Sequence, residues 1–475
     1  MTDCRHAHFV GIGGIGMSGI ARVLLQLGWT VSGSDLKPSG ITQGLQELGA
    51  RIHIGHHGDN LGEADILVVS SAVPPTNPEL VAAQQRGLTI RTRGQMLGYV
   101  MQDRCGIAVA GTHGKTTTTS MVARVLEHGK FAPTVIIGGE VNDIGSNAKL
   151  GIGTHLVAEA DESDASFLDL SPKIAVVTNI DSDVNLSAAP FSNLNYDYDK
   201  TMEKIMQVFV EFMHRVPEDG LLVLCSDNGV LKSLLPKVER PYVTYGLSEG
   251  AEFQARDIEL RNFASRCQVY RHDQHLGELT LSVPGRHNIQ NALAAVAIGL
   301  HSGLSFTQVA AALERFEGVQ RRFQLRGEYA GVMLVDDYAH NPAKVQAAVH
   351  AARSGWAKRV VAVFQPHRYT RTKFLADEFA RSFEEADILL VTDIYSAGEV
   401  PIVGVKAENL VEQIRRHGTP AEVYHTPGIH DVGEMLAETC RPGDLVILLG
   451  AGDVSSWAPV LGDYLGKPAL KKAAI

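Results

Sequence analysis

The chain has 475 residues, a formal net charge of −10, 45% hydrophobic residues and 20% charged residues. This composition is ordinary for a globular protein, and the length predicts about three domains. The acidic balance argues against a protein whose main task is to neutralise nucleic-acid phosphate. The five scattered cysteines include no CxxC pair, which argues against a disulfide framework or a zinc site. No apolar run reaches the roughly 18 residues that span a bilayer, so we expect a cytoplasmic protein with no membrane partner. The acidic balance predicts no nucleic-acid partner.

Strands and helices alternate in the first hundred residues, which predicts a parallel sheet with helices on its faces. We expect strands at 8–12, 30–33 and 66–70 and a helix at 17–27. The polar stretch 101–104 predicts the first domain boundary.

The alternation begins again twice further along the chain. The second region contains predicted strands at 106–110, 156–158, 174–178 and 221–225, then an alanine-rich helix opened by Asn288. After the polar bridge 318–322, the third region contains predicted strands at 332–335, 359–364, 388–392 and 445–449. The expected domains are therefore 1–103, 104–319 and 320–475.

Four glycines lie between the first predicted strand and the first helix, at Gly11, Gly13, Gly14 and Gly16. Glycines at this spacing let the backbone approach a diphosphate, to which the helix N-terminus offers N–H groups. Asp35 ends the next strand, where such folds often hold a ribose or a base. The pattern suits a dinucleotide or any other diphosphate ester, and a tight turn without a ligand is the structural alternative.

A second glycine loop, Gly111-Thr112-His113-Gly114-Lys115-Thr116-Thr117, follows an apolar strand and opens a helix. In such loops the backbone amides hold the β-phosphate of a nucleotide, and the lysine reaches the β- and γ-oxygens. The hydroxyl of Thr116 would then bind Mg²⁺. The loop is shorter than the usual GxxxxGK[ST] pattern, because Gly111 lies only three residues before Gly114. The sequence therefore predicts ATP and Mg²⁺ as cofactors.

A run of carboxylates, 159–164, follows another predicted strand. Mg²⁺ bound with a triphosphate takes one or two protein carboxylates, and Glu159 lies nearest the end of the strand. We therefore expect Glu159 to bind the metal, with a charged, solvated loop as the alternative.

Two further strands are followed by charged and polar residues that are candidates for the site. The segment 336–342 brings Asp336 and His340 together, although a turn that caps the next helix would have a similar sequence. Arg368 and Arg371 follow the next strand. Arginine binds carboxylate or phosphate through two parallel hydrogen bonds, so this pair predicts an anionic substrate.

Taken together, these motifs resemble those of the Mur ligases of peptidoglycan synthesis, in the same order and along nearly the whole chain. The resemblance implies an α/β fold of three domains. A Rossmann-like N-terminal domain would bind a UDP-sugar, a central P-loop ATPase domain would contain a mainly parallel sheet, and a Rossmann-like C-terminal domain would help to hold the amino acid. Within the family, the motifs are most similar to those of the ligases that join L-alanine to UDP-N-acetylmuramate. The segments that carry the resemblance are 11–21, 111–116, 159–167, 284–291, 336–342 and 365–372.

The resemblance also assigns roles to single residues, with Lys115, His340 and Arg368 in catalysis. Tyr338 and His340 would lie near the incoming amine, and Thr116 and Glu159 would bind magnesium. The implied ATP-binding residues are Gly111, Thr112, His113, Gly114, Lys115, Thr116, Thr117, His287, Asn288, Asn291 and Asp336. The implied UDP-sugar-binding residues are Gly11, Gly13, Gly14, Gly16, Asp35, Ser70, Arg368 and Arg371.

One segment departs from the family pattern. In the family, the stretch that corresponds to 178–180 is normally followed within a few residues by Asp-His, and that histidine helps to hold a second magnesium. Val184 stands here, and valine cannot bind a metal. Asp183, Asn195 or Asp197 could replace the histidine, the second metal could bind more weakly, or the enzyme could be impaired. Asn341 is a milder departure, since histidine and asparagine both occur at that position in the family.

The reaction that the resemblance implies is the activation of a carboxylate by ATP as an acyl phosphate, which an amine then attacks. Three alternatives are a ligase that attaches a recycled murein tripeptide to the same sugar nucleotide, a catalytically impaired UDP-sugar-binding protein, and a nicotinamide-dependent dehydrogenase. The phosphate loop at 111–117 argues against the dehydrogenase. Both a monomer and a homodimer are compatible with the sequence.

Overall fold

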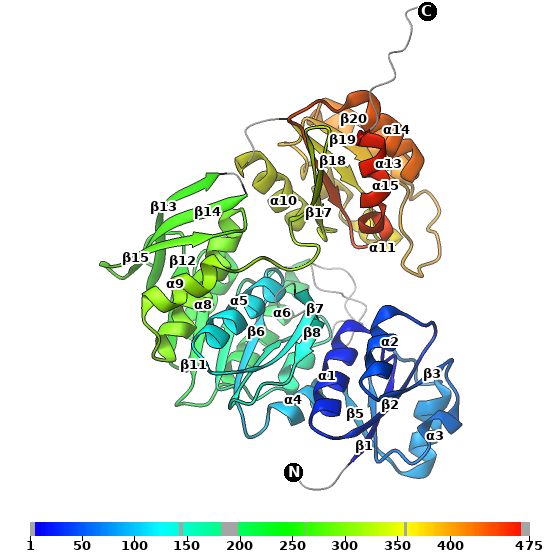
Figure 1. The fold of residues 1–475 in the computed structure, drawn as a ribbon, viewed down its shortest axis with the longest axis vertical. Helices are drawn as coiled ribbons and strands as arrows, with labels where there is room; N and C mark the ends of the chain where they lie inside the picture. The colour runs from blue at the N-terminus through cyan, green and yellow to red at the C-terminus, as the bar shows by residue number, and fades with distance from the viewer. Residues whose placement is uncertain (1–4, 142–145, 182–197, 262, 356–358, 467–475) are drawn as a thin grey trace, which may run out of the picture. The chain divides into compact units, whose positions relative to one another are not determined.

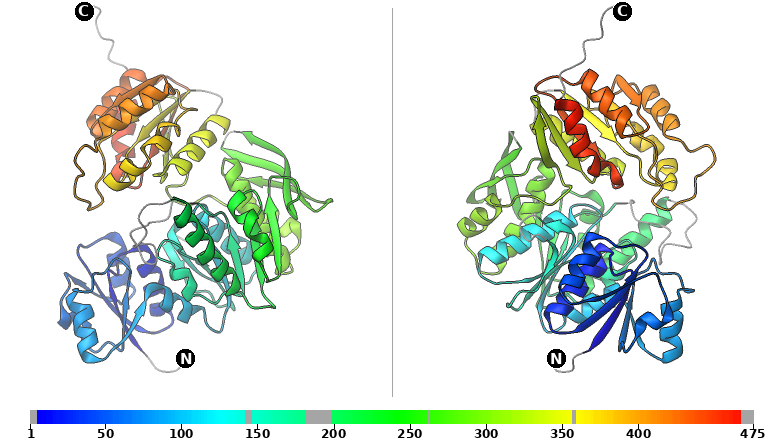
Figure 2. Two further views of the ribbon diagram at one scale, coloured as in Figure 1. Left: turned by 180° about the vertical axis from the view of Figure 1, so that it is seen from behind. Right: turned by 45° about the vertical axis from the view of Figure 1, so that its right-hand side comes forward.

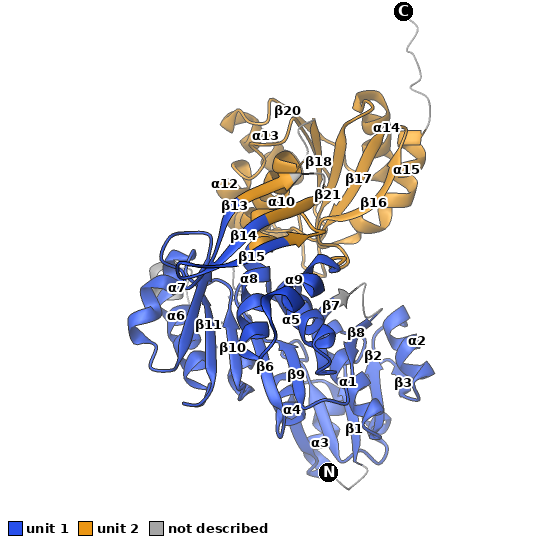
Figure 3. Ribbon diagram, turned by 60° about the vertical axis from the view of Figure 1, so that its left-hand side comes forward, with its two compact units in different colours: residues 1–257, 267–279, 290–316 blue, residues 258–266, 280–289, 317–475 orange. Residues whose placement is uncertain are grey.

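The computed structural model describes residues 5–141, 146–181, 198–261, 263–355 and 359–466. Contacts among the described residues divide the chain into two compact units (Figure 3). The first comprises 1–257, 267–279 and 290–316, and the second comprises 258–266, 280–289 and 317–475. The strands form three sheets, of five, ten and six strands.

The first sheet has the order β3-β2-β1-β4-β5, and all its neighbouring strands are parallel (Figure 1). The order reverses between β1 and β4, so the carboxyl ends of these strands form the kind of switch point where open α/β sheets bind ligands. The strands are β1 (His6–Val10), β2 (Thr30–Asp35), β3 (Arg51–Ile54), β4 (Ile66–Val69) and β5 (Thr89–Thr92). The helices are α1 (Ile15–Gln26), α2 (Gly40–Glu47), η1 (Gly58–Leu61), α3 (Pro78–Arg86) and α4 (Arg93–Met101).

The second sheet has the order β15-β14-β13-β12-β11-β10-β6-β9-β7-β8. Its strands are β6 (Cys105–Ala110), β7 (Thr134–Val141), β8 (Ser146–Lys149), β9 (His155–Glu159), β10 (Ile174–Val177), β11 (Leu221–Cys225), β12 (Tyr242–Gly246), β13 (Phe253–Arg261), β14 (Ala264–Arg271) and β15 (Gln274–Leu281). The helices of this region are α5 (Lys115–His128), η2 (Ser166–Asp169), α6 (Tyr198–His214), α7 (Gly229–Leu234), η3 (Leu235–Lys237), α8 (Arg286–His301) and α9 (Phe306–Glu314).

β6 and its neighbour β10 form the core of that sheet because they are largely apolar. Residues 107–110 of β6 and 175–177 of β10 are fully buried. Continuous apolar runs of this kind are typical of parallel strands covered on both faces. β6 pairs in parallel with β9 and β10, so the loops that follow all three strands leave the sheet at the same edge.

The third sheet has the order β16-β17-β21-β18-β19-β20, and only its edge strand β16 is antiparallel to its neighbour among the pairs described. The strands are β16 (Gln324–Tyr329), β17 (Val332–Asp337), β18 (Val360–Phe364), β19 (Ile388–Val391), β20 (Glu422–His425) and β21 (Leu445–Leu449). The helices are α10 (Pro342–Gly355), α11 (Tyr369–Phe374), α12 (Ala376–Ala380), α13 (Ala407–His417), α14 (Ile429–Thr439), η4 (Asp453–Trp457) and α15 (Ala458–Gly466).

Alternate residues of the third sheet point into two apolar layers. One layer packs the sheet against α10, α12 and α13, and the other packs it against α14 and α15. Figure 2 shows α15, in red, lying across the second face. This is the doubly wound arrangement expected of a Rossmann-like domain.

The predicted strands are present, with small corrections to their ends. Asp336 and Asp337 are the last residues of β17 rather than the first residues after it, and α8 begins at Arg286 rather than at Asn288. The prediction did not include β3, β5, β7, β8, β12 to β16 or β20. Among these, β14 to β16 have exposed polar positions that resemble loops in sequence. Within the described ranges, the structure contains no helix with the length and apolar character needed to cross a membrane.

Candidate active site

The phosphate loop connects β6 to α5, and its shape depends on two glycines. Gly111 has a φ of +129°, and a Cβ at this position would lie 2.1 Å from Thr178 Oγ1. Gly114 has a φ of +81° and lies against Asn291 Oδ1. The first N–H groups of α5 have no carbonyl partner within the helix, as at any helix N-terminus. The loop therefore presents backbone N–H groups to an anion.

The segment after β10 holds the phosphate loop in this shape. Thr178 Oγ1 donates a hydrogen bond to the carbonyl oxygen of His113 (2.6 Å), and the N–H of His113 donates to Asn179 Oδ1 (2.8 Å). The N–H of Asp181 donates to Thr112 Oγ1 (2.9 Å). These hydrogen bonds join the phosphate loop to the segment after β10 through the protein's own residues.

Lys115 is bound by a carboxylate that the sequence analysis did not single out. Its ammonium donates to both carboxylate oxygens of Glu162 (2.8 and 2.6 Å) and to the carbonyl oxygen of Gly111 (2.7 Å). The two side chains are only 14% and 7% exposed. Burial would lower the pKa of Lys115, but the carboxylates of Glu162 and Glu159 raise it above its ordinary value. Lys115 is therefore a charged group that needs an anionic partner.

The predicted magnesium ligands lie at the same edge of the sheet. Glu159 ends β9, and its Oε2 accepts a hydrogen bond from the N–H of Gly138 (2.8 Å). Thr116 lies in the first turn of α5 and is nearly buried. The described ranges contain no cluster of three or more His, Cys, Asp or Glu residues that could hold a metal alone. One hydroxyl and one carboxylate nevertheless match Mg²⁺ bound to a triphosphate, which supplies the remaining oxygens with water.

The departure at Val184 lies outside the described residues. So do Asp183, Asn195 and Asp197, the residues considered as replacements for a metal-binding histidine. The alternatives for a second metal site therefore stay predictions from the sequence.

The first glycine loop is fixed by the end of β2. The N–H groups of Gly11 and Ile12 both donate to the carbonyl oxygen of Ser34 (2.8 and 3.0 Å). The N–H of Gly13 donates to Asp35 Oδ2 (2.8 Å), so the Asp35 carboxylate braces the loop itself. Its predicted contact with a ribose or base stays a prediction. Helix α1 begins at Ile15 without a side-chain cap, which leaves its first N–H groups available to a diphosphate.

A buried polar cluster supports this loop and was not predicted. Ser34 Oγ donates to Glu79 Oε2 (2.5 Å), and Asn60 Nδ2 donates to Glu79 Oε1 (2.6 Å). Burial would raise the pKa of Glu79, but His8, Ser34 and Asn60 around it lower that pKa to about 2. No motif marks Glu79, because its partners are distant in sequence. Ser70, a predicted sugar-nucleotide residue, lies directly after β4, and its carbonyl oxygen accepts the N–H of Val73 (3.1 Å).

In the second unit, the two aspartates that end β17 have different partners. Asp337 accepts the N–H groups of Phe323 and Ala339 (both 2.8 Å), and burial raises its pKa to about 6. Asp336 accepts a hydrogen bond from Ser455 Oγ (2.5 Å), while its Oδ1 is buried without a partner among the described residues. Asp337 therefore braces the turn, and Asp336 keeps an acceptor for a ligand.

The residues predicted near the amine lie together in the second unit. His340 Nδ1 is 2.7 Å from the carbonyl oxygen of Tyr338, so Nδ1 carries the proton and Nε2 is the basic nitrogen. The His340 and Tyr338 rings meet edge to face, with centroids 5.0 Å apart. Burial lowers the pKa of His340 well below its ordinary value, as do the charges of Lys344 and Arg371. This imidazole is therefore neutral at neutral pH, with an unprotonated Nε2.

The two predicted arginines lie at the start of α11. Arg371 Nη1 donates to His367 Nδ1 (3.1 Å). Arg368 has a φ of +73°, a conformation that non-glycine residues rarely adopt and that often occurs at functional sites. Its Nη1 lies 3.9 Å from Glu399 Oε1, and Glu399 also accepts the Thr370 N–H (3.0 Å). The structure thus brings His340, His367 and both arginines into one region of the second unit.

Three of the implied ATP-binding residues, which the resemblance places near the adenine, have separate surroundings. Asn291 Oδ1 accepts a hydrogen bond from Thr118 Oγ1 (3.1 Å) and lies against Gly114, so it supports the phosphate loop. Asn288 Nδ2 donates to the carbonyl oxygen of Pro284 (2.6 Å). Burial lowers the pKa of His287 to about 4. Their contact with adenine stays a prediction.

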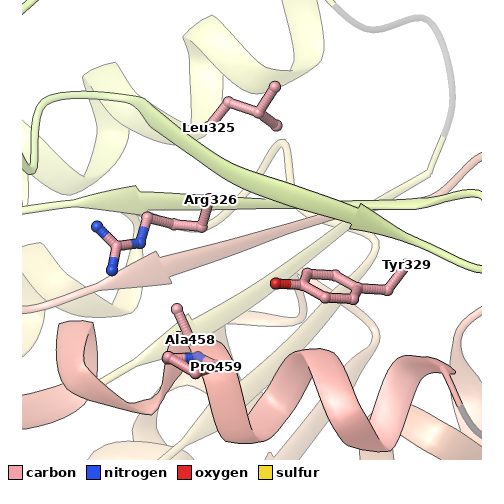
Figure 4. Close-up of a pocket in the computed structure, with 5 residues that line it drawn as sticks. All are labelled: Leu325, Arg326, Tyr329, Ala458 and Pro459. Atoms are coloured by element: carbon pink, nitrogen blue, oxygen red, sulfur yellow. The ribbon is translucent and has the colours of Figure 1, made fainter.

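A pocket of about 180 Å³ in the second unit lies between β16 and α15 (Figure 4). It is lined by Leu325, Arg326, Tyr329, Ala458 and Pro459, none of which is a predicted site residue. Its lining contains one charged side chain and no nucleophile. We therefore assign it no part in the site.

Comparison with known families accounts for the pairing of a diphosphate loop with an ATP-type phosphate loop. Three family models match the chain: the Mur ligase family catalytic domain at 6–104, the Mur ligase middle domain at 109–299, and the Mur ligase glutamate ligase domain at 321–452. The chain belongs to the Mur ligase family, whose members are ATP-dependent ligases that form amide bonds.

The relatives narrow the comparison within that family. The UDP-N-acetylmuramate–L-alanine ligase of Geotalea daltonii is 50% identical over 447 residues, which cover 94% of this chain and 95% of the relative. The crystal structure of UDP-N-acetylmuramate-alanine ligase MurC from Thermotoga maritima has a TM-score of 0.78 at 28% identity, covering 96% and 98% of the two chains. A murein peptide ligase from Psychrobacter arcticus has a TM-score of 0.68 at 25% identity, covering 99% and 100%.

The geometry at Gly111 predicts the cost of a single methyl group. We expect Gly111→Ala to lower the thermal unfolding midpoint more than Gly28→Ala, a matched control with a φ of +84° and open space around its Cβ position. Both changes force a left-handed residue, at roughly 1–2 kcal/mol, and only the first adds a clash of about 1–3 kcal/mol. Equal decreases in the unfolding midpoints of the two variants, measured by differential scanning calorimetry, would contradict a clash at Gly111.

The position of the Lys115 ammonium at the phosphate loop predicts a specific loss of activity when it is removed. We expect Lys115→Met to lower phosphate release from ATP by roughly 10²–10³-fold, the usual cost of removing one preorganised donor to developing charge. Lys149→Met is the control, because Lys149 makes a surface ion pair with Glu127 and is 52% exposed. A Lys115→Met variant that keeps more than about a tenth of the wild-type rate would contradict this role.

Proposed function

We propose that this chain joins L-alanine to the carboxylate of UDP-N-acetylmuramate, with conversion of ATP to ADP and phosphate, in the synthesis of peptidoglycan precursors. The observation that carries the proposal is the pair of loops in one unit: a diphosphate loop after β1 and a phosphate loop whose lysine already contacts a carboxylate. The identity of about half of all residues to L-alanine ligases supports the choice of amino acid. We assign 1–103 to the sugar nucleotide, 104–319 to ATP and 320–475 to the amino acid.

The first half of the reaction makes the carboxylate reactive. The carboxylate attacks the γ-phosphorus of ATP, ADP leaves, and an acyl phosphate forms. The loop amides and Lys115 stabilise the charge on the transferring oxygens, with Lys115 exchanging Glu162 for phosphate. Thr116 and Glu159 would hold Mg²⁺, which would supply neutralisation of the phosphate charge.

The second half forms the amide bond. The alanine amine attacks the acyl carbon, and phosphate leaves from the tetrahedral intermediate. The neutral imidazole of His340 takes the proton that the amine loses, through Nε2. Arg368 and Arg371 bind the anionic groups of the muramate substrate, and Tyr338 fixes the orientation of His340 through its backbone carbonyl.

The test is phosphate release measured with UDP-N-acetylmuramate, ATP, Mg²⁺ and L-alanine, each omitted in turn. We expect turnover only when all four are present, because the acyl phosphate needs both the activated carboxylate and an acceptor amine. Replacing L-alanine with the murein tripeptide should abolish turnover. Turnover with the tripeptide alone would favour the recycling ligase, and UDP-N-acetylmuramate binding without any ATP consumption would favour the impaired binding protein.

A further inference from the structure

Arg93, the first residue of α4, contacts the segment 160–169 that follows β9 and lies beside the phosphate loop, here called the acidic loop. Its Nη2 donates to Asp161 Oδ2 (3.0 Å) and to Ser166 Oγ (2.8 Å), and it lies 3.6 Å from Asp164 Oδ1. The Arg93 side chain is 17% exposed. Burial would raise the pKa of Asp161, but Arg93 and Lys115 lower it, so Asp161 is an anion. The contact is therefore a partly buried, charge-assisted one.

The same side chain lies against the first glycine loop. A Cβ added to Gly16, in the first turn of α1, would be 3.2 Å from Arg93 Cδ and 3.4 Å from Arg93 Nη1. Gly16 is one of the residues predicted to bind the UDP diphosphate. The Arg93 side chain thus lies beside Gly16 of the first glycine loop while its guanidinium binds the acidic loop.

Neighbouring contacts hold the acidic loop on the same side. Ser71 Oγ donates to Asp164 Oδ2 (2.9 Å), and Thr92 Oγ1 donates to Asp169 Oδ2 (3.1 Å). Helix α4 also packs closely on η2, since a Cβ at Gly98 would lie 2.4 Å from the carbonyl oxygen of Asp169. Arg93 is the member of this group that reaches the carboxylates beside Lys115.

The placement of Glu162 gives these contacts a consequence for ATP. Glu162 lies between Asp161 and Ser166, the two residues that Arg93 holds, and its carboxylate binds Lys115. Glu159, the proposed magnesium ligand, ends the strand that leads into the same loop. We propose that Arg93 is a positioning residue for the ATP site, although it belongs to the segment that binds the sugar nucleotide. It fixes the acidic loop so that Glu159, the proposed magnesium ligand, lies at the phosphate loop.

This inference rests on the proposed function only for the identity of the two ligands. It predicts that a change at Arg93, in the segment proposed to bind the sugar nucleotide, weakens ADP binding at the neighbouring site and leaves sugar-nucleotide binding nearly unchanged. Removing a residue that orients groups around a metal typically costs 10–100-fold in metal affinity or activity. We therefore expect Arg93→Ala to raise the Kd of MgADP about tenfold, while the Kd of UDP-N-acetylmuramate changes by less than about threefold.

The experiment is isothermal titration of the full chain with MgADP and, separately, with UDP-N-acetylmuramate. Arg91→Ala is the matched control, because Arg91 lies two residues away and its guanidinium stacks on Tyr99, 4.6 Å from the ring centroid. We expect the control to bind MgADP as the wild type does. Arg93→Lys should recover only part of the affinity, since lysine keeps the charge and loses the planar fork.

A second variant keeps the test decisive if Arg93→Ala folds poorly. Asp161→Asn removes the charge that Arg93 binds while conserving size, and it should weaken MgADP binding to a similar degree. The variant that carries both changes should bind MgADP no more weakly than the single variant with the higher Kd, because both changes remove the same interaction. Additive losses would contradict a shared role.

Two other outcomes would overturn the proposal. An unchanged Kd for MgADP in a folded Arg93→Ala variant would reduce Arg93 to a structural contact. A loss of UDP-N-acetylmuramate affinity alone would make it a direct ligand of the sugar nucleotide. Both readouts are binding measurements, so they hold whether or not the chain ligates L-alanine, and failure of the proposed function is seen separately in phosphate release.

Discussion

A lysine ammonium at the N-terminal end of a helix is the group around which the site is organised. The macrodipole of α5 places partial positive charge beside Lys115, and burial removes most of the water that would stabilise the ammonium. An unpaired buried charge costs several kcal/mol, so this lysine needs an anion. Glu162 supplies one through two short hydrogen bonds, and a nucleotide phosphate would supply another. We therefore expect a nucleotide phosphate to replace Glu162 as the partner of Lys115.

The topology of the sheets places the groups that take part in this exchange. β6 and β9 are parallel neighbours with Val109 opposite Glu159, so the phosphate loop and the acidic loop leave the sheet at one edge. The segment after β10 leaves at that edge too and fixes the loop through Thr178 and Asn179. Arg93 binds the acidic loop through Asp161 and Ser166, and its side chain lies beside Gly16 of the first glycine loop. The two loops predicted to bind the sugar nucleotide and ATP are therefore linked through neighbouring side chains of the first unit.

The sequence predicted the parts of this arrangement that depend on local pattern. Apolar runs such as 106–110 identify buried parallel strands, and glycines with free helix N-termini identify phosphate loops. It did not predict Glu162, Arg93 or Glu79, because their roles come from partners 45 to 68 positions away in sequence. An acidic residue in a loop looks the same whether it is solvated or paired with a buried lysine. The difference between Asp336 and Asp337 likewise depends on the donors each carboxylate meets, which are the Ser455 hydroxyl for Asp336 and backbone N–H groups for Asp337.

We infer that Glu162 and a nucleotide phosphate compete for Lys115. The most direct test is to measure ADP binding by the Glu162→Gln variant in the presence of EDTA. Glutamine keeps the size of the side chain and removes the charge, while EDTA removes any contribution of Glu162 to metal binding. The account predicts about tenfold tighter ADP binding than in the wild type, since a hydrogen bond to a charged group is worth roughly 1.5–3 kcal/mol. Glu127→Gln, which removes the carboxylate from a surface ion pair with Lys149, should bind ADP as the wild type does. Unchanged or weaker ADP binding by Glu162→Gln would contradict the exchange.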